Sequence, residues 1–240
     1  MAFPDVVTRE EWLEARKRLL AQEKQATRER DALNAERRRL PMVAVDKEYV
    51  FDGPDGKLAL ADLFDGSRQL IVQHVMFGPD WDGACSGCTA GINETSDGMR
   101  AHLKSRDTNF VLVSRAPLEK LRQYQAKMGW TIPWYSSYGS DFNYDYQATV
   151  DKQRRQLVYN YKEQPDLLED EDSTEVPGFS FFLRDGDRLF HTYSTWARGA
   201  DIVGSAYSFL DLTALGRQEE WEEPKGRAPK PHEADPSFSD

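Results

Sequence analysis

The sequence predicts an α/β fold in which a mixed central β-sheet is flanked by helices. Strand-sized apolar runs alternate with amphipathic helical segments through the middle of the chain. One long charged helical pattern precedes them, and a proline-rich charged segment follows them. We therefore expect an N-terminal helical arm (1–41), an α/β domain (42–216) with an aromatic-rich insertion (130–175), and a disordered C-terminal tail (217–240).

Composition excludes several classes of protein. The 240 residues include 31 Lys and Arg against 41 Asp and Glu, and a net charge of −10 disfavours nucleic acid as a partner. Two cysteines cannot make a disulfide-rich scaffold or a zinc site of four thiolates within one chain. The sequence has neither a signal-peptide pattern nor an apolar run long enough to span a membrane. We expect a cytoplasmic protein.

The arm is predicted to be one helix over residues 8–39. Thr8 and Glu11 have capping-box spacing, and Pro41 marks the end. An apolar stripe repeats every seven residues at Trp12, Leu19, Ala26, Leu33 and Leu40. The stripe is too thin to bury the helix deeply. Two interpretations remain: a charged arm that lies across its own domain, or a dimerisation arm that packs on a second subunit.

The first half of the α/β domain begins with a predicted strand at 43–51. A turn at 53–56, a short segment at 60–64, a strand at 69–77 and a helix at 86–104 follow. The strand at 69–77 is nearly continuously apolar, which is typical of a strand that is covered on both faces. The helix is predicted from apolar residues at three- and four-residue steps.

The second half continues with a strand at 109–114 and a helix that starts at Pro117. After the insertion, a β-hairpin is predicted at 179–194, with Asp185-Gly186 in its turn. A closing helix is expected after Gly199, with Ile202 and Val203 on its apolar face. A βαβ unit followed by a hairpin and a helix indicates a mixed sheet.

Cys85-Ser86-Gly87-Cys88 follows a predicted buried strand and opens a predicted helix. The helix N-terminus stabilises a thiolate on the first cysteine, because its backbone N–H groups and dipole favour negative charge. A thiolate is the attacking species in disulfide exchange, so Cys85 is predicted to be the nucleophile and Cys88 the resolving thiol. Ser86 and Gly87 lie where a substrate would approach.

Other uses of the cysteines stay open. Zinc would need two more ligands, and none of His74, His102, His191 and His232 stands at ligand spacing, although a site shared by two chains is possible. His74 is expected to be a core histidine. Two inert buried cysteines are the simplest alternative. Asp82 or Glu94 could accept the proton of Cys88.

A peroxidase is a further alternative, with the signature P-x-x-x-[TS]-x-x-C. Pro79 precedes Cys85 by six positions rather than seven, and Asp82 replaces the hydroxyl residue. Peroxidase activity is therefore disfavoured, although Arg115 at a strand end could bind an anion or a peroxide.

Four segments carry a family resemblance: MFGPDWDGACSGCTAG, RDTNFVLVSRAPLEKLRQYQAKMGW, PWYSSYGSDFNYDY and VPGFSFFLRDGDRLFHTYSTWARG. They resemble a bacterial thioredoxin-like family of unknown function whose members are described as predicted dithiol–disulfide oxidoreductases. The resemblance implies a thioredoxin-like fold related to the peroxiredoxin branch, with Cys85 and Cys88 as the redox pair. Members often have proline after the first cysteine, where this chain has Ser86.

A thioredoxin-like fold also implies a role for Val176-Pro177, which comes just before the predicted hairpin. Such folds place a cis-proline opposite the two cysteines, where the backbone pairs with substrate, and a cis bond is expected at Pro177. Trp81 is predicted to shape the contact surface near the thiols.

The predicted function is thus that of a thiol–disulfide oxidoreductase with no cofactor. Its substrate would be a disulfide-containing protein or small molecule, and a separate reductant would regenerate it. The alternative is a dimeric binding or scaffold protein whose cysteines are inert or share a metal ion.

Overall fold

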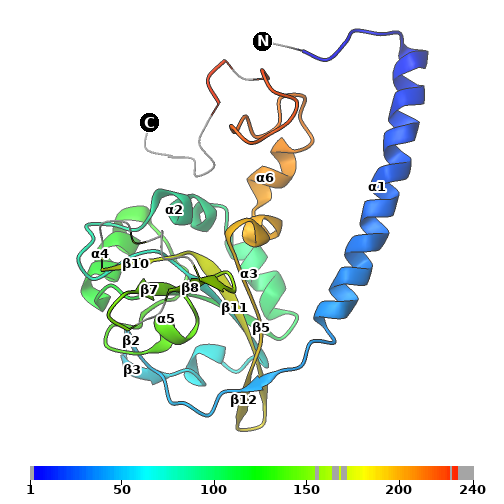
Figure 1. Ribbon diagram of the computed structural model, residues 1–240. Coiled ribbons are helices and arrows are strands. Elements are labelled where there is room, and N and C mark those ends of the chain that lie inside the picture. Colours follow the sequence, from blue (N-terminus) through cyan, green and yellow to red (C-terminus); the bar gives the residue numbers. More distant parts are fainter. Residues whose placement is uncertain (1–2, 155–156, 164–167, 169–171, 228, 232–240) are drawn as a thin grey trace. The chain divides into compact units, whose positions relative to one another are not determined.

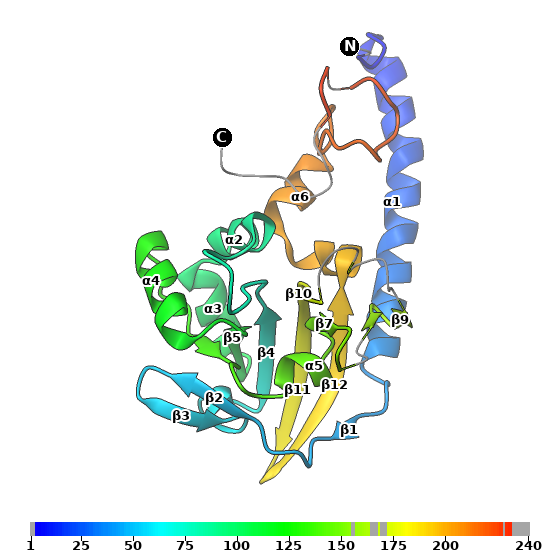
Figure 2. The ribbon, with the colours of Figure 1, turned by 60° about the vertical axis from the view of Figure 1, so that its left-hand side comes forward.

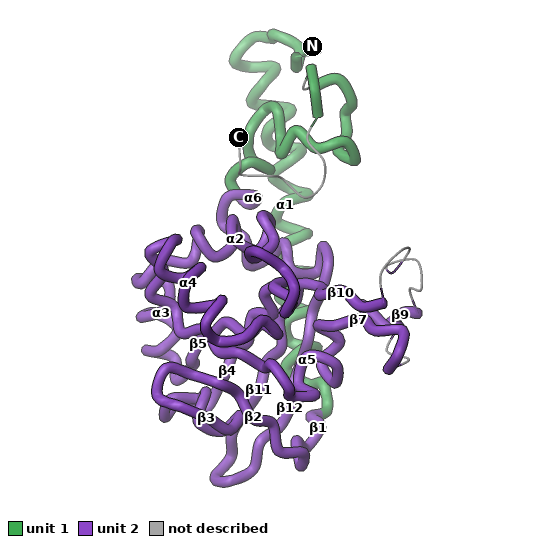
Figure 3. Tube along the Cα trace, turned by 90° about the vertical axis from the view of Figure 1, so that its left-hand side faces the viewer, with its two compact units in different colours: residues 1–41, 209–234 green, residues 42–208, 235–240 purple. Residues whose placement is uncertain are grey.

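The computed structural model describes residues 3–154, 157–163, 168, 172–227 and 229–231. The chain divides into two units (Figure 3), each of which is described by itself. Unit 1 consists of Met1–Pro41 and Phe209–Ala234. Unit 2 consists of Met42–Ser208 together with Asp235–Asp240, and the latter segment lies outside the described residues.

The predicted arm helix is confirmed as α1 (Arg9–Arg37). Its capping box is complete: the Glu11 N–H donates to Thr8 Oγ1 at 3.2 Å, and the Thr8 N–H donates to Glu11 Oε2 at 2.9 Å. These two bonds satisfy backbone donors that a helix start leaves without intrahelical partners. No side chain of α1 is buried.

Unit 2 contains an eight-stranded mixed sheet in the order β1-β12-β11-β4-β5-β6-β2-β3 (Figures 1 and 2). β4 is parallel to β5, and β5 is parallel to β6, whereas the other pairs are antiparallel. The order β12-β11-β4-β5-β6 at the centre of the sheet is that of a thioredoxin-like fold, as predicted. The strands are β1 (Val43–Ala44), β2 (Val50–Gly53), β3 (Gly56–Ala59), β4 (Gln69–His74), β5 (Thr108–Ser114), β6 (Trp134–Ser136), β11 (Gly178–Asp185) and β12 (Arg188–Trp196).

The prediction of one strand over 43–51 is wrong, because the segment forms two strands in different parts of the sheet. β1 pairs with β12, whereas β2 pairs with β3 and β6. Between them the chain crosses from one edge of the sheet toward the other, with Lys47 bonded to Asp141 and Asp145 at 2.9 and 2.6 Å. Apolar alternation does not reveal that a chain changes its pairing partner. The predicted turn at 53–56 joins β2 to β3.

The helix predicted over 86–104 is two helices, α2 (Ser86–Asn93) and α3 (Asp97–Lys104). Ser96 breaks the pattern, since its Oγ accepts the N–H of Met99 at 3.0 Å and so caps α3. The preceding strand ends at His74 rather than at residue 77. The predicted helix after Pro117 is confirmed as α4 (Leu118–Met128).

The predicted hairpin is confirmed as β11 and β12, with Gly186 and Asp187 between the last paired residues. The helix predicted after Gly199 is confirmed in part as α6 (Ser205–Leu210), whereas its first residues belong to a 3₁₀ helix, η3 (Ala197–Val203). Ile202 and Val203 are exposed, so the predicted apolar face is not packed inward.

The aromatic-rich insertion contributes to the main sheet through β6. Its remaining elements include α5 (Phe142–Asp145) and two small antiparallel pairs, β7 (Thr149–Asp151) with β10 (Ser173–Glu175) and β8 (Val158–Tyr159) with β9 (Lys162–Glu163). Trp134, Phe142 and Tyr146 are buried. Burying an aromatic or large aliphatic side chain is worth about 1.5–3 kcal/mol, so these residues stabilise the fold.

Apolar cores cover the two faces of the central strands. Leu70 and Val72 of β4 pack with Phe142 in one core. Val75 packs with Ile92 of α2 in the other, which also holds Cys88. A third cluster contains Tyr159, Val176 and Trp196.

The segment predicted to be a disordered tail is described at 217–227 and 229–231, where it forms turns and bends. Residues 228 and 232–240 lie outside the described residues. Within the described part of the chain, no helix is long and apolar enough to cross a membrane.

Candidate functional site

Cys85 lies where the chain leaves the sheet and enters α2. It is the N-cap of α2 and is half-buried. Its N–H donates to the carbonyl oxygen of Met76 at 2.9 Å, and its own carbonyl accepts the N–H of Thr89 at 2.9 Å. Backbone bonds therefore fix Cys85 between the end of β4 and the first turn of the helix, as the sequence predicted.

Cys88 lies one helical turn further on and is buried, with 7% of its surface exposed. The N–H of Met76 points at its Sγ, 3.5 Å away. Both cysteines are present as thiols rather than as a disulfide. Met76 thus uses its carbonyl for one cysteine and its N–H for the other, so one residue sets the position of both.

The loop before Cys85 is held by α4. Lys120 Nζ donates to the carbonyl oxygens of Pro79 and Trp81, at 2.7 and 2.9 Å. The Trp81 side chain packs against the core that contains both cysteines. Sequence reasoning missed Lys120, because its partners are backbone carbonyls, which no residue pattern encodes.

Val176 and Pro177 lead into β11, the strand that pairs with β4. The register of the two strands ends with Gly178 of β11 opposite His74 of β4. Before that pair, the Val176 N–H donates to the Ala148 carbonyl oxygen at 3.0 Å, and Val176 packs with Tyr159 and Trp196 rather than in the core of the cysteines. Val176 is buried and Pro177 is exposed. The prediction of a cis bond at Pro177 is wrong: among the described residues, the peptide bond that is cis is Glu223–Pro224.

Tyr159 connects Pro177 to the segment after β12. Its hydroxyl lies 3.3 Å from the Pro177 carbonyl oxygen, to which it donates, and accepts the N–H of Ala197 at 3.1 Å. Burial raises the pKa of the Tyr159 hydroxyl above 10, and the nearby Cys88 adds to this effect. Sequence reasoning missed Tyr159, which lies in the irregular insertion.

A buried ion pair occupies the other face of the sheet at the same end. Glu175, 1% exposed, pairs with Arg115 at 2.6 Å and accepts from Thr149 at 2.8 Å and Asn143 at 3.2 Å. Arg115 also donates to the Tyr144 hydroxyl at 2.5 Å. Burial raises the pKa of the Glu175 carboxyl, against the effect of its bonding partners.

This pair bears on the peroxidase alternative. The parallel pairing of β4 and β5 continues past the strands, since the Val75 N–H donates to Val113 and the Ala116 N–H donates to Phe77, so the Arg115 backbone lies beside Met76. An arginine at this strand end could bind an anion or a peroxide. Its contacts with Glu175 and Tyr144 instead give it internal partners, which weakens the case for such a role.

The remaining predicted residues have clear positions. Ser86 is exposed and Gly87 half-buried in the first turn of α2, next to Cys85. Asp82 is exposed in the loop before Cys85. Glu94 lies at the far end of α2, where its carboxylate accepts the N–H groups of Ser205 and Ala206 at 2.7 and 3.0 Å. It therefore caps α6 rather than facing Cys88.

His74 is a core histidine, as predicted. Its Nε2 bonds to Ser180 Oγ at 2.8 Å, and Ser180 bonds to Ser194 at 2.9 Å. Its Nδ1 is buried without a hydrogen-bond partner. Burial, with a smaller contribution from His191, lowers the pKa of His74 to about 3. The side chain is therefore neutral near pH 7.

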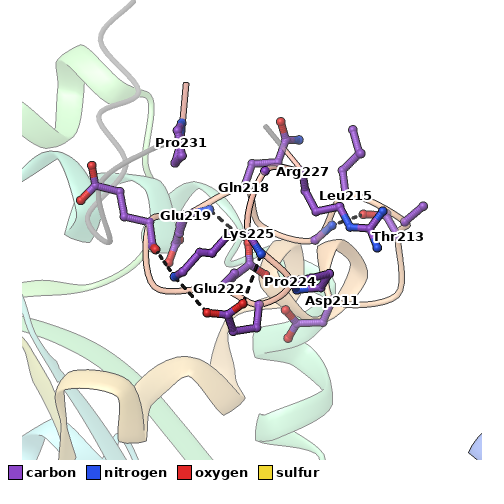
Figure 4. Close-up of a pocket in the computed structure, with 15 residues that line it drawn as sticks. Asp211, Thr213, Leu215, Gln218, Glu219, Glu222, Pro224, Lys225, Arg227 and Pro231 are labelled. Atoms are coloured by element: carbon purple, nitrogen blue, oxygen red, sulfur yellow. Dashed lines mark hydrogen bonds and ion pairs between the residues drawn. The ribbon is translucent and has the colours of Figure 1, made fainter. Parts of the chain in front are cut away.

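Metal ligands are not grouped in the described part of the chain, where no three His, Cys, Asp or Glu side chains lie close enough to hold an ion. A pocket of about 230 Å³ occurs within unit 1, between residues 211 and 231 (Figure 4). Glu222 lines this pocket, and its carboxylate accepts the N–H groups of Arg217 and Glu219, at 3.0 and 3.1 Å. The carboxylate is therefore bonded to the backbone of its own loop.

The fold and the site together define a class: a thioredoxin-like α/β protein with a Cys-x-x-Cys pair at the start of the helix that follows β4. The chain belongs to the family described as bacterial protein of unknown function (DUF899), whose model it matches over residues 1–234. This confirms the resemblance inferred from the sequence. No curated protein matches the chain.

Solved structures give distant likenesses. PrxQ of Xylella fastidiosa is 11% identical, with 65% of this chain and 85% of that chain covered and a TM-score of 0.41. A Chlorobium tepidum structure named as a thiol:disulfide interchange protein DsbE is 16% identical, with 74% and 99% covered and a TM-score of 0.42. The strand order of the sheet identifies the fold.

Proposed function

We propose that the protein is a thiol–disulfide oxidoreductase in which Cys85 is the nucleophile and Cys88 the resolving thiol. The observation that carries this proposal is the position of Cys85 as the N-cap of α2, with its N–H bonded to the carbonyl oxygen of Met76 just beyond β4. The backbone N–H groups of a helix start and the positive end of the helix dipole favour a thiolate there. Cys88 follows at a distance of one helical turn.

The proposed reaction needs no organic cofactor. The Cys85 thiolate attacks one sulfur of a substrate disulfide, the substrate S–S bond breaks, and the leaving thiolate takes up a proton. Cys88 then loses its proton and attacks the Cys85 sulfur, which releases the second substrate thiol and leaves a Cys85–Cys88 disulfide. Two electrons have passed to the substrate, and an external dithiol reductant returns them.

The substrate would be a disulfide-containing protein or small molecule that approaches across the exposed end of α2. Ser86 and Gly87 follow Cys85 in the first turn of α2, and Pro177 is exposed just before β11. Trp81 packs in the same core as both thiols. We assign these residues and Val176 to the substrate contact surface.

The test is a redox titration of the two thiols in glutathione buffers, followed by mass spectrometry. We expect a reversible Cys85–Cys88 disulfide in the wild type. The Cys88→Ser variant should accumulate a mixed disulfide on Cys85, because the resolving thiol is missing. The Cys85→Ser variant is the matched control and should form far less.

The pH profile of Cys85 alkylation in the Cys88→Ser variant adds a second readout. A midpoint clearly below the ordinary thiol value of ~8.5 is expected. An alkylation midpoint at the ordinary thiol value, together with no reversible disulfide in the titration, would contradict the oxidoreductase proposal. The protein would then be a binding or scaffold protein. Metal bound by protein purified without chelator would favour a shared metal site.

A further inference from the structure

Within unit 1, the arm helix α1 does not bury its apolar stripe. Its 29 residues span about 44 Å at 1.5 Å per residue, and none of them is buried. In the stripe, Trp12 is 44% exposed, Leu19 50% and Leu33 52%. A helix of this kind gains little stability alone in water and depends on packing. The stripe supplies one of the two apolar positions that a coiled coil repeats in each heptad.

Charged residues border the stripe on both sides in its C-terminal half. Residues three positions after a stripe residue lie on one side, and residues four positions after it lie on the other. Glu29 and Glu36 form one border, and Arg30 and Arg37 form the other. The stripe therefore separates an acidic border from a basic one.

This arrangement is self-complementary for one direction of pairing. If two copies pack stripe to stripe in parallel, the two-fold axis places the acidic border of each against the basic border of the other. If they pack antiparallel about Ala26, Arg16 faces Arg37 of the second copy, which is repulsive, while Glu23 faces Arg30, which is attractive. The antiparallel arrangement therefore gains no net charge complementarity, whereas every bordering charge of the C-terminal half has an opposite partner in the parallel one.

We propose that α1 pairs in parallel with α1 of a second copy of this chain, with Leu19 against Leu19 and Leu33 against Leu33. The opposite charges of the two borders and the exposed apolar side chains of the stripe both support a second copy as the occupant. The proposal does not depend on thiol chemistry, because α1 contains no cysteine.

The first test measures mass by light scattering during size exclusion. The wild type is expected at twice the 27.5 kDa of one chain, and Leu19→Asp/Leu33→Asp at the mass of one chain. Lys24→Asp, which lies away from the stripe, should remain dimeric. Circular dichroism checks that each variant is folded. A monomeric wild type, or a double variant that stays dimeric, overturns the proposal.

The second test determines direction by cross-linking in a Cys85→Ser/Cys88→Ser background. Leu19→Cys and Leu33→Cys should each form a disulfide-linked dimer, whereas Lys24→Cys should not. If only Ala26→Cys cross-links, the helices are antiparallel and the proposed arrangement is wrong. Equal cross-linking at all positions would mean that contacts are random and would overturn it too.

The third test swaps the borders. Arg30→Glu/Arg37→Glu should raise the dimer dissociation constant roughly tenfold, since four attractive contacts across the two-fold axis become repulsive. Adding Glu29→Arg/Glu36→Arg should restore the affinity, because the borders are again complementary. If the four-residue variant is no tighter than the two-residue variant, α1 packs on something other than α1.

Discussion

Two sites lie near the end of β4, on opposite faces of the sheet. The contacts that position their residues are of different kinds. On the α5 face, Glu175 binds Arg115, Thr149 and Asn143 through its side chain. On the α2 face, the contacts that position Cys85 come from its backbone. A side chain committed to several buried bonds stabilises the fold, whereas a side chain positioned by its backbone can change its chemistry at small structural cost.

The comparison predicts its largest effect at Glu175. Glu175→Ala removes the acceptor of three side chains and leaves the largely buried Arg115 charge without its carboxylate. We expect the free energy of unfolding to fall by about 3–5 kcal/mol in urea titrations. Lys57→Ala is the control, since the Lys57–Asp52 pair is exposed and its loss should cost less than about 1 kcal/mol. Equal losses would remove the distinction between the two ion pairs.

His74, on the same face as Glu175, gives a pH-dependent prediction. Its pKa is about 3 in the folded protein against 6.5 as the ordinary value, so the unfolded chain binds more protons between these two values. Stability is therefore retained above pH 6.5 and lost as the pH falls below it. From pH 7 to 5 the loss from this residue should be about 2 kcal/mol.

Urea unfolding at pH 7 and pH 5 measures this loss. In the His74→Gln variant the fall in stability between the two pH values should be smaller than in the wild type by that amount. A variant that loses as much stability as the wild type would show that His74 does not carry the pH dependence.

Tyr159→Phe tests the connection between the Pro177 segment and the cysteine face. The Pro177 carbonyl and the Ala197 N–H would lose their shared partner, and we expect a loss of about 1–2 kcal/mol in thermal or urea unfolding. Tyr161→Phe serves as the matched control, because Tyr161 is exposed although its hydroxyl donates to the Ser194 carbonyl. A larger effect in the control would contradict the assigned role of Tyr159.

The smallest effect is expected at Cys85. Cys85→Ser should change the free energy of unfolding by no more than about 0.5 kcal/mol, because the backbone bonds that fix the residue are kept. Cys88→Ser buries a hydroxyl among apolar side chains and should cost about 1–2 kcal/mol. If urea titrations give the reverse order, the cysteine face is held by the Cys85 side chain after all.

The parts of the fold that sequence predicts are those with local causes. The capping box at Thr8, the turn at residues 53–56 and the strand-to-helix junction at Cys85 all depend on neighbouring residues. The division of 43–51 into two strands and the α2–α3 break were not predicted, since the first depends on distant pairing partners. Ser96 was a readable signal for the second, because a serine between two helical segments is a common cap.

The candidate site shows the same limit. Cys85 and Cys88 could be chosen because their spacing and their place in the chain are visible in the sequence. Arg115 and Glu175 are distant in sequence and become partners only when the end of β5 and β10 come together in the folded chain. The isomer of the bond before Pro177 depends on tertiary packing around Val176 and was predicted wrongly from the fold class alone.

The pairing of β1 with β12 has a consequence for the order in which the protein is made. Val43 leaves the ribosome early, yet its partner His191 belongs to the last strand of the sheet to be synthesised. β4 likewise can pair with β11 only after the aromatic-rich insertion between them has been synthesised. A nascent chain that ends before Gly178 therefore displays one open flank of β4, beside a completed Cys-x-x-Cys sequence. The thiols are thus translated well before the sheet that positions them can close.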